Sequence, residues 1–491
     1  MALSEEKKEY SNFVGGKWVK SETGETFETV NPANTKQQVG RFQLSGADDS
    51  ISAVHEAQKA FPAWKNMPPP QRGKVLYKAA DIMESELEDI SKTLTTEEGK
   101  TLAESRGEVQ RAIDIFRFFA GQGSRLNGST VPSATSRTFL YTTRGPVGVV
   151  ALMTPWNFPI AIPAWKIAPA LICGNSVVFK PASLTPLTAI KLVSALERAG
   201  LPTGVLNFVT GPGGTVGEEL ATNPGVDAIS FTGSYEVGYG IQRARSNSKK
   251  MARGQLQMGG KNPTVVLPDA KLDEAVDLVV RSGFGLTGQA CTATSRVIIQ
   301  DSVKQDFSRK LSERAAKVRV ADGLKPDTQM GPAVSKPEFE KDLDYIEVGK
   351  SEGAKILVGG KKSDLEENAN GYFVEPTVFD DVYPDMRIAR EEIFGPVLSL
   401  MAAKNLDEAV ELANNSEFGL TAGICTSNLS NALEFAERVE AGVIKINRPT
   451  TGLELQVPFG GFKKSSSDTF KEQGQEAVEF YSRIKTVYVG Y

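Results

Sequence analysis

The chain has 491 residues, which at roughly 100–200 residues per domain corresponds to two or three domains, each able to bury a core. Its composition, with 40% hydrophobic and 24% charged residues, is typical of a globular protein and excludes a disordered chain. The 56 basic and 60 acidic residues nearly cancel, so no positive surplus exists for binding a phosphate backbone. We expect an enzyme that binds no nucleic acid.

The few cysteine and histidine residues narrow the chemistry further. Cys173, Cys291 and Cys425 lie far apart, so neither a disulfide framework nor a zinc ribbon is predicted, and a reducing cytoplasm fits best. No signal-peptide pattern and no apolar run of the roughly 20 residues that span a membrane is found. His55, the only histidine, falls in an amphipathic helical stretch, which argues against histidine-dependent catalysis and multi-histidine metal sites.

From residue 147 onward, short apolar runs alternate with segments of helical periodicity. Strands are predicted at 147–153, 176–180, 205–209 and 228–232. Helices are predicted at 161–173 and 187–199. A Gly-rich turn at 210–214 precedes a third helix that ends at 221, and a fourth helix begins at 234. Repeated βαβ units of this kind predict a parallel sheet with helices on both faces.

A second α/β set begins near residue 255. Its predicted strands are 264–267 and 297–300, around a helix at 272–283, with further helices at 407–415 and 432–440. Two segments match neither set, because 137–143 alternates apolar and polar residues and 486–491 has the pattern of an edge strand. A swapped β-arm would account for both.

Two short segments contain side chains suited to acyl or aldehyde chemistry. Cys291 lies among small polar residues in 288–296, an accessible turn where a thiolate forms if amides or a cation lower its pKa. The alternative for Cys291 is a small buried residue. Asn157 follows a buried strand at the carboxyl edge of the sheet, where it can donate to an oxyanion or simply cap a turn.

The segment 231–238 runs from a predicted strand into a helix and carries Gly233 and Gly238. A helix N-terminus of this kind favours the phosphates of a dinucleotide. The spacing is not GxGxxG, and a plain βα turn is the alternative reading.

Seven motifs follow one another in the order found in the aldehyde dehydrogenase family, which the chain resembles over essentially its whole length. They are PWNFP at 155–159, KPA at 180–182, FTGS at 231–234, MGGKNP at 258–263, GQAC at 288–291, EEIFGPV at 391–397 and PFGG at 458–461. Within the family, 285–289 and 452–456 are similar to the 2,5-dioxopentanoate (α-ketoglutaric semialdehyde) dehydrogenases.

The resemblance implies an α/β fold with three parts. A Rossmann-type NAD(P)-binding domain would span 1–136 and 145–254, and an α/β catalytic domain 255–450. A small β oligomerisation arm and tail would span 137–144 and 470–491 and pair with a partner subunit in a homodimer or homotetramer.

The resemblance also implies a mechanism. A Cys291 thiolate would attack the aldehyde carbon, while the Asn157 side chain and the Cys291 backbone N–H hold the resulting oxyanion, at roughly 3 kcal/mol per donor. Hydride transfer to the nicotinamide would leave a thioester that water hydrolyses to the acid, and no metal is required.

One position departs from the family pattern. Gln257 stands where the family has the glutamate that acts as general base in deacylation. An amide has no usable basicity, so this isostere, natural or introduced, predicts impaired deacylation, with Glu392 as the first substitute base. The alternative is a catalytically silent protein that has kept the fold.

The resemblance places the cofactor against residues from both halves of the chain. The expected contacts are Thr154, Pro155, Trp156, Lys180, Ser183, Gly213, Gly233, Ser234, Gly238, Gly259, Glu392 and Phe394. Ser183 replaces a glutamate that repels a 2′-phosphate, and Lys180 can bind that phosphate, so NADP is expected, with NAD also possible. For Trp156 and Phe394, burial in the core is the alternative.

Substrate selection is predicted from the residues around the aldehyde tunnel. Related succinate-semialdehyde enzymes carry arginines where Trp165 and Gly285 stand, so this pocket should be more apolar. Phe158, Trp165, Phe284 and Leu286 would line it, and Arg448 would bind a substrate carboxylate unless it is a surface residue. We expect 2,5-dioxopentanoate or a similar semialdehyde, with another aliphatic or aromatic aldehyde as the alternative.

Overall fold

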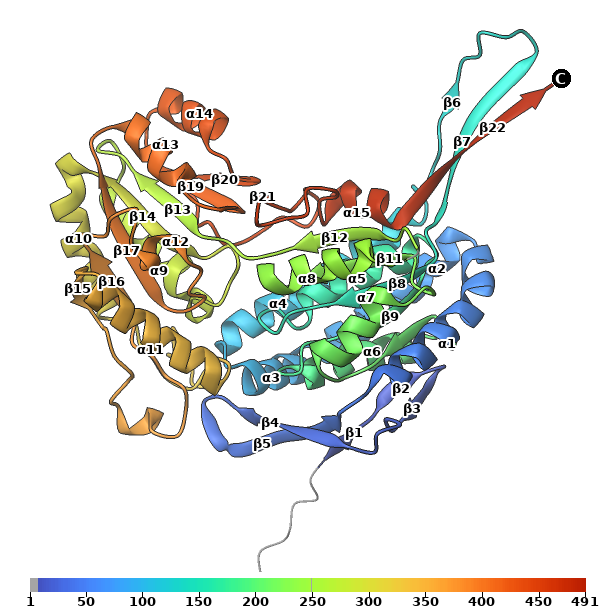
Figure 1. The fold of residues 1–491 in the computed structure, drawn as a ribbon, viewed down its shortest axis with the longest axis horizontal. Helices are drawn as coiled ribbons and strands as arrows, with labels where there is room; N and C mark the ends of the chain where they lie inside the picture. The colour runs from blue at the N-terminus through green and yellow to red at the C-terminus, as the bar shows by residue number, and fades with distance from the viewer. Residues whose placement is uncertain (1–7, 249) are drawn as a thin grey trace, which may run out of the picture.

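The computed structural model, which describes residues 8–248 and 250–491, contains two seven-stranded sheets, each covered by helices (Figure 1). In the first sheet, five parallel strands are followed by two antiparallel ones. In spatial order they are β12 (Arg253–Gln257), β11 (Ala228–Thr232), β8 (Val149–Met153), β9 (Ser176–Lys180), β10 (Leu206–Phe208), β2 (Asn12–Val14) and β3 (Lys17–Val19).

The first sheet is covered on both faces because successive side chains of its strands point to opposite sides. Val150 and Leu152 of β8 enter one core, and Ala151 and Met153 enter the other. The first core is formed with α2 (Pro69–Ser85), α3 (Leu87–Glu98), α4 (Leu102–Gln122), α5 (Ala161–Ile172) and α6 (Pro186–Arg198). The second is formed with α1 (Ala47–Asn66), η1 (Gly213–Gly217), α7 (Glu218–Thr222) and α8 (Tyr235–Ser246). The predicted parallel sheet with two helical layers is confirmed.

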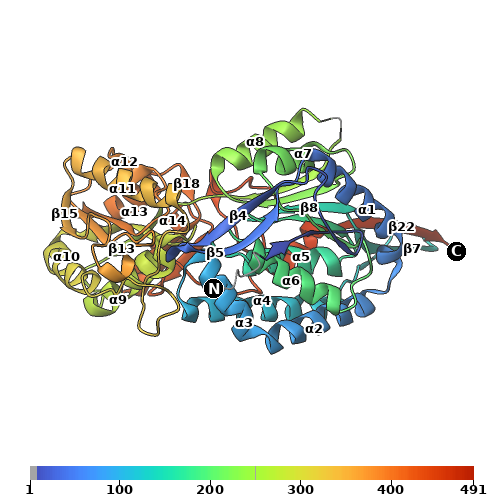
Figure 2. The same ribbon diagram turned by 90° about the horizontal axis from the view of Figure 1, so that it is seen from below.

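The second sheet repeats this plan and lies beside the first (Figure 2). Its order is β15 (Lys355–Val358), β16 (Thr377–Asp380), β17 (Val397–Ala403), β14 (Thr294–Gln300), β13 (Asn262–Val266), β19 (Thr421–Cys425) and β20 (Val443–Ile446), with only the β15–β16 pair antiparallel. Its helices are α9 (Leu272–Phe284), α10 (Asp301–Ala315), α11 (Lys336–Ser351), α12 (Arg387–Arg390), α13 (Leu406–Asn414) and α14 (Leu429–Arg438).

Two of the expected domain limits do not follow the observed division of the fold. The limit at 254 lies within β12, which completes the first sheet through a ladder that ends at the pair Thr232 and Gln257. The tail expected from 470 first forms α15 (Gly474–Tyr481), whose Phe480 and Tyr481 are buried in the first core. The sequence alone does not show that these two segments belong to the first sheet and its core, because they are too polar or too short.

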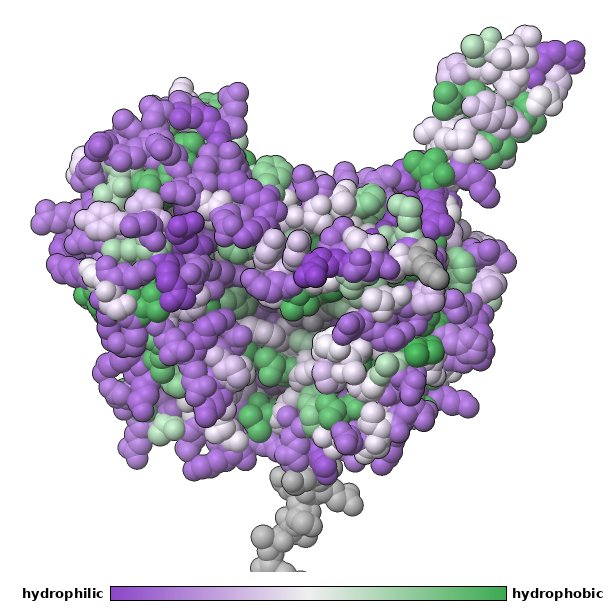
Figure 3. All heavy atoms as spheres, viewed as in Figure 1, coloured by the Kyte–Doolittle hydropathy of each residue, from purple (hydrophilic) through white to green (hydrophobic). Residues whose placement is uncertain are grey.

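The segments predicted as edge strands form an arm that projects from the body (Figure 1). β7 (Thr138–Pro146) pairs antiparallel with β22 (Ser482–Gly490), and β6 (Thr130–Val131) lies along β7. Large apolar side chains on the arm are exposed, including Phe139 and Ile484, and Figure 3 shows hydrophobic residues along it.

The remaining elements are short. A three-stranded sheet consists of β1 (Glu9–Tyr10), β5 (Asn34–Gln43) and β4 (Thr26–Asn31), and β18 (Phe418–Gly419) pairs with β21 (Phe462–Lys463). The 3-10 turns are η2 (Gly285–Gly288) and η3 (Glu366–Asn368). His55 is on the solvent face of α1, with 63% of its side chain exposed. Within 8–248 and 250–491, no helix combines the length and apolar character needed to cross a membrane.

Candidate active site

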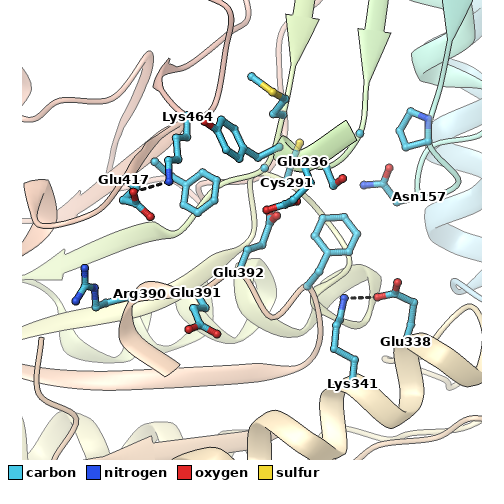
Figure 4. Close-up of a pocket in the computed structure, with 18 of the residues that line it drawn as sticks. Asn157, Glu236, Cys291, Glu338, Lys341, Arg390, Glu391, Glu392, Glu417 and Lys464 are labelled. Atoms are coloured by element: carbon cyan, nitrogen blue, oxygen red, sulfur yellow. Dashed lines mark hydrogen bonds and ion pairs between the residues drawn. The ribbon is translucent and has the colours of Figure 1, made fainter. Parts of the chain in front are cut away.

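Two cavities meet at Cys291. A cleft of about 640 Å³ is lined by residues from segments around both sheets, among them Asn157, Gly233, Glu392 and Cys291 (Figure 4). A second cavity of about 360 Å³ has mostly apolar walls, and it also includes Cys291. Cys291 therefore lies where a cleft of mixed polar and apolar character meets a smaller apolar cavity.

The turn that carries Cys291, between η2 and β14, is fixed by backbone contacts. Asn262 Nδ2 donates to the carbonyls of Cys291 and Ala293, at 2.7 and 2.8 Å. Gly288 has φ of +69°, and a Cβ there would lie 2.2 Å from the Gly395 carbonyl oxygen, so the turn requires glycine at this position. Asn262 and Gly288 belong to the sequence motifs, and their positions explain why those motifs contain these residues.

The environment of Cys291 keeps its thiol neutral in the protein alone. Burial raises the pKa of Cys291 to about 12, and the charges of Glu392 and Glu472 raise it further, against the backbone N–H groups of Cys291 and Thr292. Backbone amides were expected to lower the pKa of Cys291, but the effect of burial is larger. Burial also raises the pKa of Cys173 and of Cys425 to about 12, but those two side chains lie in the cores.

Asn157 lies beside the Cys291 turn, with its side-chain amide buried. Its Nδ2 donates to the carbonyl of Gln289, two residues before Cys291, at 2.9 Å. This hydrogen bond fixes the orientation of the Asn157 amide. Asn157 also lines the cleft, and Figure 4 shows its amide and Cys291 in the same part of it. The amide has two N–H groups, so one remains free to donate to an oxyanion that forms when the Cys291 sulfur attacks a carbonyl carbon.

The backbone around Asn157 is held by two buried side chains from another part of the chain. Lys100 Nζ donates to the Asn157 carbonyl at 2.5 Å and to Glu108 Oε2 at 2.7 Å. Glu108 Oε1 accepts from the amides of Ile160 and Ala161, at 3.0 and 3.1 Å, at the start of α5. The sequence analysis missed both residues, because nothing near positions 100 and 108 indicates a contact fifty residues away.

Lys100 carries its charge in spite of its burial. Burial lowers its pKa, but the carboxylates of Glu108 and Glu98 outweigh this and hold the pKa above its ordinary value. The ammonium group also lies 4.5 Å from the centre of the Phe158 ring. A fixed positive charge therefore holds the loop that presents Asn157.

Replacing Lys100 with methionine should slow formation of reduced cofactor in a single turnover about tenfold, because the Asn157 carbonyl and Glu108 lose a charged hydrogen-bond donor. Stopped-flow absorbance at 340 nm measures this rate, and thermal unfolding checks that the variant is folded. Lys92→Met, an exposed position of α3, is the matched control. An unchanged single-turnover rate in folded Lys100→Met protein would show that this contact does not position Asn157.

Gln257 ends β12 next to Thr232, a residue that lines both cavities. The Gln257 side chain is 2% exposed, and its Nε2 donates to the Met258 carbonyl at 3.2 Å. Gln257 lines neither cavity in this conformation. Its amide is close to the site but has no proton-accepting nitrogen or carboxylate.

Glu392 is a carboxyl group of the cleft wall close to Cys291 (Figure 4). Its Oε1 accepts from the Gly260 amide at 2.8 Å, and a Cβ at Gly259 would lie 2.0 Å from its Oε2, so Gly259 must lack a side chain. Burial raises the pKa of Glu392 to about 7. This carboxyl group therefore changes its protonation near neutral pH.

A second carboxylate near the thiol, Glu472, was missed by the sequence analysis. It is 2% exposed and accepts from Trp165 Nε1 at 3.0 Å and from Lys166 Nζ. Thr232 Oγ1 donates to it at 3.4 Å. Glu472 comes from the segment before α15, which returns to the first sheet only in the fold, so no local pattern indicates its position.

Most of the predicted cofactor residues lie at or after the carboxyl ends of β8, β9 and β11, which are neighbours in the sheet, while Gly259, Glu392 and Phe394 come from segments beyond β11. The cleft is lined by seven of them, Pro155, Trp156, Gly233, Ser234, Gly259, Glu392 and Phe394. The rings of Trp156 and Phe394 meet edge to face with centroids 5.4 Å apart, on the cleft wall and not in a core. Thr154, Lys180, Ser183, Gly213 and Gly238 are not part of the wall of this cleft.

Lys180 is the last residue of β9, Ser183 follows shortly after it, and both lie near η1. Lys180 Nζ donates to the Pro181 carbonyl at 3.0 Å, and Ser183 Oγ donates to the Gly211 carbonyl at 3.1 Å. A Cβ at Gly217 would lie 3.8 Å from the Lys180 side chain. Burial lowers the pKa of Lys180 to about 8, so an anion would stabilise its charged form. The cleft, the N-terminus of α8 and this lysine together fit a nicotinamide dinucleotide.

The apolar cavity contains three of the five predicted substrate residues, Phe158, Trp165 and Leu286. Phe284 instead packs in the core of the second sheet, because it is the last residue of α9 and its ring faces that sheet. Arg448 is exposed and does not line the cavity. Two other arginines, Arg111 and Arg281, do. Within the described chain, no three His, Cys, Asp or Glu side chains are grouped to hold a metal ion.

The sequence model of the aldehyde dehydrogenase family matches residues 18–487, so the chain belongs to this family of aldehyde-oxidising oxidoreductases. It is 47% identical over 492 residues to the alpha-ketoglutaric semialdehyde dehydrogenase of Bacillus subtilis (strain 168), covering 100% of both chains. It is 48% identical over 478 residues to the 2,5-dioxopentanoate dehydrogenase of Saccharolobus solfataricus, covering 97% of this chain and 99% of the other.

Solved structures confirm the fold. The betaine aldehyde dehydrogenase of Staphylococcus aureus in complex with NAD+ has a TM-score of 0.95 at 34% identity, covering 98% of this chain and 94% of the other. The NAD-dependent aldehyde dehydrogenase of Sinorhizobium meliloti has a TM-score of 0.95 at 37% identity, covering 99% and 95%. The predicted aldehyde dehydrogenase fold is therefore confirmed.

Proposed function

We propose that the protein oxidises a short semialdehyde, 2,5-dioxopentanoate or a close analogue, to the carboxylic acid, with NADP or NAD as oxidant, and that Gln257 makes deacylation slow. The observation that carries this proposal is the position of Cys291, which lines both the dinucleotide-sized cleft and the apolar cavity. The relatives that act on such semialdehydes are similar to this chain over its full length.

The proposed acylation uses groups around Cys291. The sulfur attacks the aldehyde carbon as the thiol proton passes to water in the cleft, and the carbonyl oxygen becomes an oxyanion held by Asn157 Nδ2 and the Cys291 backbone N–H. A nicotinamide dinucleotide held in the cleft by Trp156, Gly233 and Phe394 would supply the acceptor for the hydride of the former aldehyde carbon. The carbon–sulfur bond remains, so a thioester is left on Cys291.

Hydrolysis of that thioester needs a base to take a proton from water. Gln257 cannot do so, and the carboxyl group of Glu392 is the nearest alternative on the cleft wall. Its pKa of about 7 means that it is partly ionised at neutral pH. Its Oε1 is also engaged by the Gly260 amide. Slow deacylation follows from this arrangement.

Rapid mixing of the protein with NADP and 2,5-dioxopentanoate tests the proposal. We expect about one equivalent of reduced cofactor per active site, followed by a much slower phase, because acylation is intact and deacylation is not. Absorbance at 340 nm measures both phases. The absence of any reduced cofactor in a single turnover, with this and with other aldehydes, would contradict the proposed activity.

Ser183→Glu should weaken NADP binding about tenfold and leave NAD binding nearly unchanged, because a carboxylate near the ribose would repel a 2′-phosphate. Binding is measured by quenching of tryptophan fluorescence without substrate. Ser194→Glu, on α6, is the matched control for added charge. Equal weakening of both cofactors would show that residue 183 does not contact the 2′ position.

The exposed apolar side chains of the arm support a dimer or a dimer of dimers. The β7–β22 pair has one unpaired edge along β22, and Ile484, Tyr488 and Val489 are exposed on it. Light scattering at micromolar concentration distinguishes this proposal from a monomer.

A further inference from the structure

The apolar cavity contains one cation without a partner, and that feature bears on substrate selection. Its walls are Phe158, Ile162, Trp165, Leu286 and Phe459, and the guanidinium groups of Arg111 and Arg281 are the cations that line it. A charged group on an otherwise apolar wall fixes the orientation of a ligand that carries the opposite charge.

Arg111 is already bound within the protein. Its Nη2 donates to Gln473 Oε1 at 2.8 Å, and its Nη1 donates to the Leu453 carbonyl. It therefore holds the loop around Leu453 against the segment before α15. A substrate would have to compete with these contacts.

Arg281 differs from Arg111 in this respect. It lies in the last turn of α9 with an exposed side chain, and its guanidinium makes no hydrogen bond or ion pair to any residue in 8–248 or 250–491. The acidic residues of its own helix are engaged elsewhere, because Asp273 pairs with Lys310, Glu274 with Lys271 and Asp277 with Arg314.

The two carboxylates that line the same cavity already accept hydrogen bonds from groups other than Arg281. Glu104 Oε1 accepts from the Leu286 amide at 2.8 Å, and its Oε2 accepts from the Thr101 amide at 2.9 Å. Glu108 is paired with Lys100. Neither forms an ion pair with Arg281, so its five N–H donors remain available to a ligand.

We propose that Arg281 binds the carboxylate at the end of the substrate opposite the aldehyde, so that the enzyme selects aldehydes with a terminal carboxylate over uncharged aldehydes of the same length. This inference rests on the proposed semialdehyde activity. Arg281 is four residues before Gly285, and both line the cavity; the only atom that a Cβ at Gly285 would meet is Glu104 Oε1, at 3.7 Å. Arg448, which is exposed and outside the cavity, is not used.

The test compares burst rates with 2,5-dioxopentanoate and with pentanal, which has the same chain length and no charge. For Arg281→Gln, we expect the second-order burst constant for 2,5-dioxopentanoate to fall about 10- to 100-fold, the range for loss of a charged hydrogen bond. The constant for pentanal should change less than twofold, and Arg281→Lys should recover part of the loss. Arg309→Gln, which removes exposed ion pairs with Asp306 and Glu313 within α10 and leaves the acidic residues of α9 engaged, is the matched control.

A second readout does not depend on turnover. Glutarate, which has two carboxylates and no aldehyde, should slow alkylation of Cys291 by iodoacetamide in the unmodified protein and not in Arg281→Gln. An equal fall for both aldehydes, no fall for either, or a selective fall in Arg448→Gln instead would overturn the role of Arg281. Glutarate protection without any burst would contradict the proposed activity and leave the binding role of Arg281 in place.

Discussion

Gln257→Glu is expected to increase steady-state turnover by 10²- to 10⁴-fold, the range typical of restoring a general base, while the burst rate changes little. Glutamine and glutamate have nearly the same size, and the Gln257 side chain is buried at the end of β12, so the substitution keeps the shape of the site. Only the ability to accept a proton from water is added. Stopped-flow measurement over many turnovers gives both phases from one experiment.

The control for this prediction is Glu392→Gln. If Glu392 is responsible for the residual turnover, that turnover should rise with pH through about 7, because only the ionised carboxyl group accepts a proton, and it should be lost in Glu392→Gln. Gln255→Glu, at another buried position of β12, controls for an added carboxyl group in the same strand. Steady turnover without a burst, unaffected by Gln257→Glu, would show that deacylation is not limited at this position.

Asn157→Ala should lower the burst rate by about 10²- to 10³-fold, the cost of removing one donor to an oxyanion. Cofactor binding should change little, because the Asn157 amide contacts the Gln289 carbonyl beside Cys291. The measurement is the burst rate at saturating NADP, with cofactor affinity from fluorescence quenching. Asn127→Ala, at an exposed position, is the matched control.

A burst rate within threefold of the unmodified protein would contradict the role of Asn157 as oxyanion donor. A loss that disappears at higher NADP concentration would indicate instead that the residue supports cofactor binding. Thermal unfolding of Asn157→Ala separates both outcomes from a misfolded loop, since Lys100 still holds the main chain at this position.

The parallel strands were predictable because a strand buried on both faces is a short continuous apolar run. The run 176–180 coincides with β9, and 228–232 coincides with β11. β12 was not predicted, because Arg253, Gly254 and two glutamines interrupt its apolar pattern although the strand is paired with β11 over its length.

The proposed reacting group and two of its neighbours were also accessible from sequence, because Cys291, Asn157 and Glu392 stand within recognisable motifs. Lys100, Glu108 and Glu472 were not, because each acts through a contact with a distant segment that only the fold creates. Arg281 and Phe284 show the same limit, because residues three apart on α9 face different surroundings, one the cavity and one the core.

Intact-mass spectrometry of the protein after mixing with NADP and 2,5-dioxopentanoate tests the central claim most directly. The account predicts one added acyl group per chain, attached to Cys291, which persists for the duration of the slow phase. The adduct should be absent in Cys291→Ala and short-lived in Gln257→Glu. Unmodified protein during steady production of acid would contradict slow deacylation at Gln257.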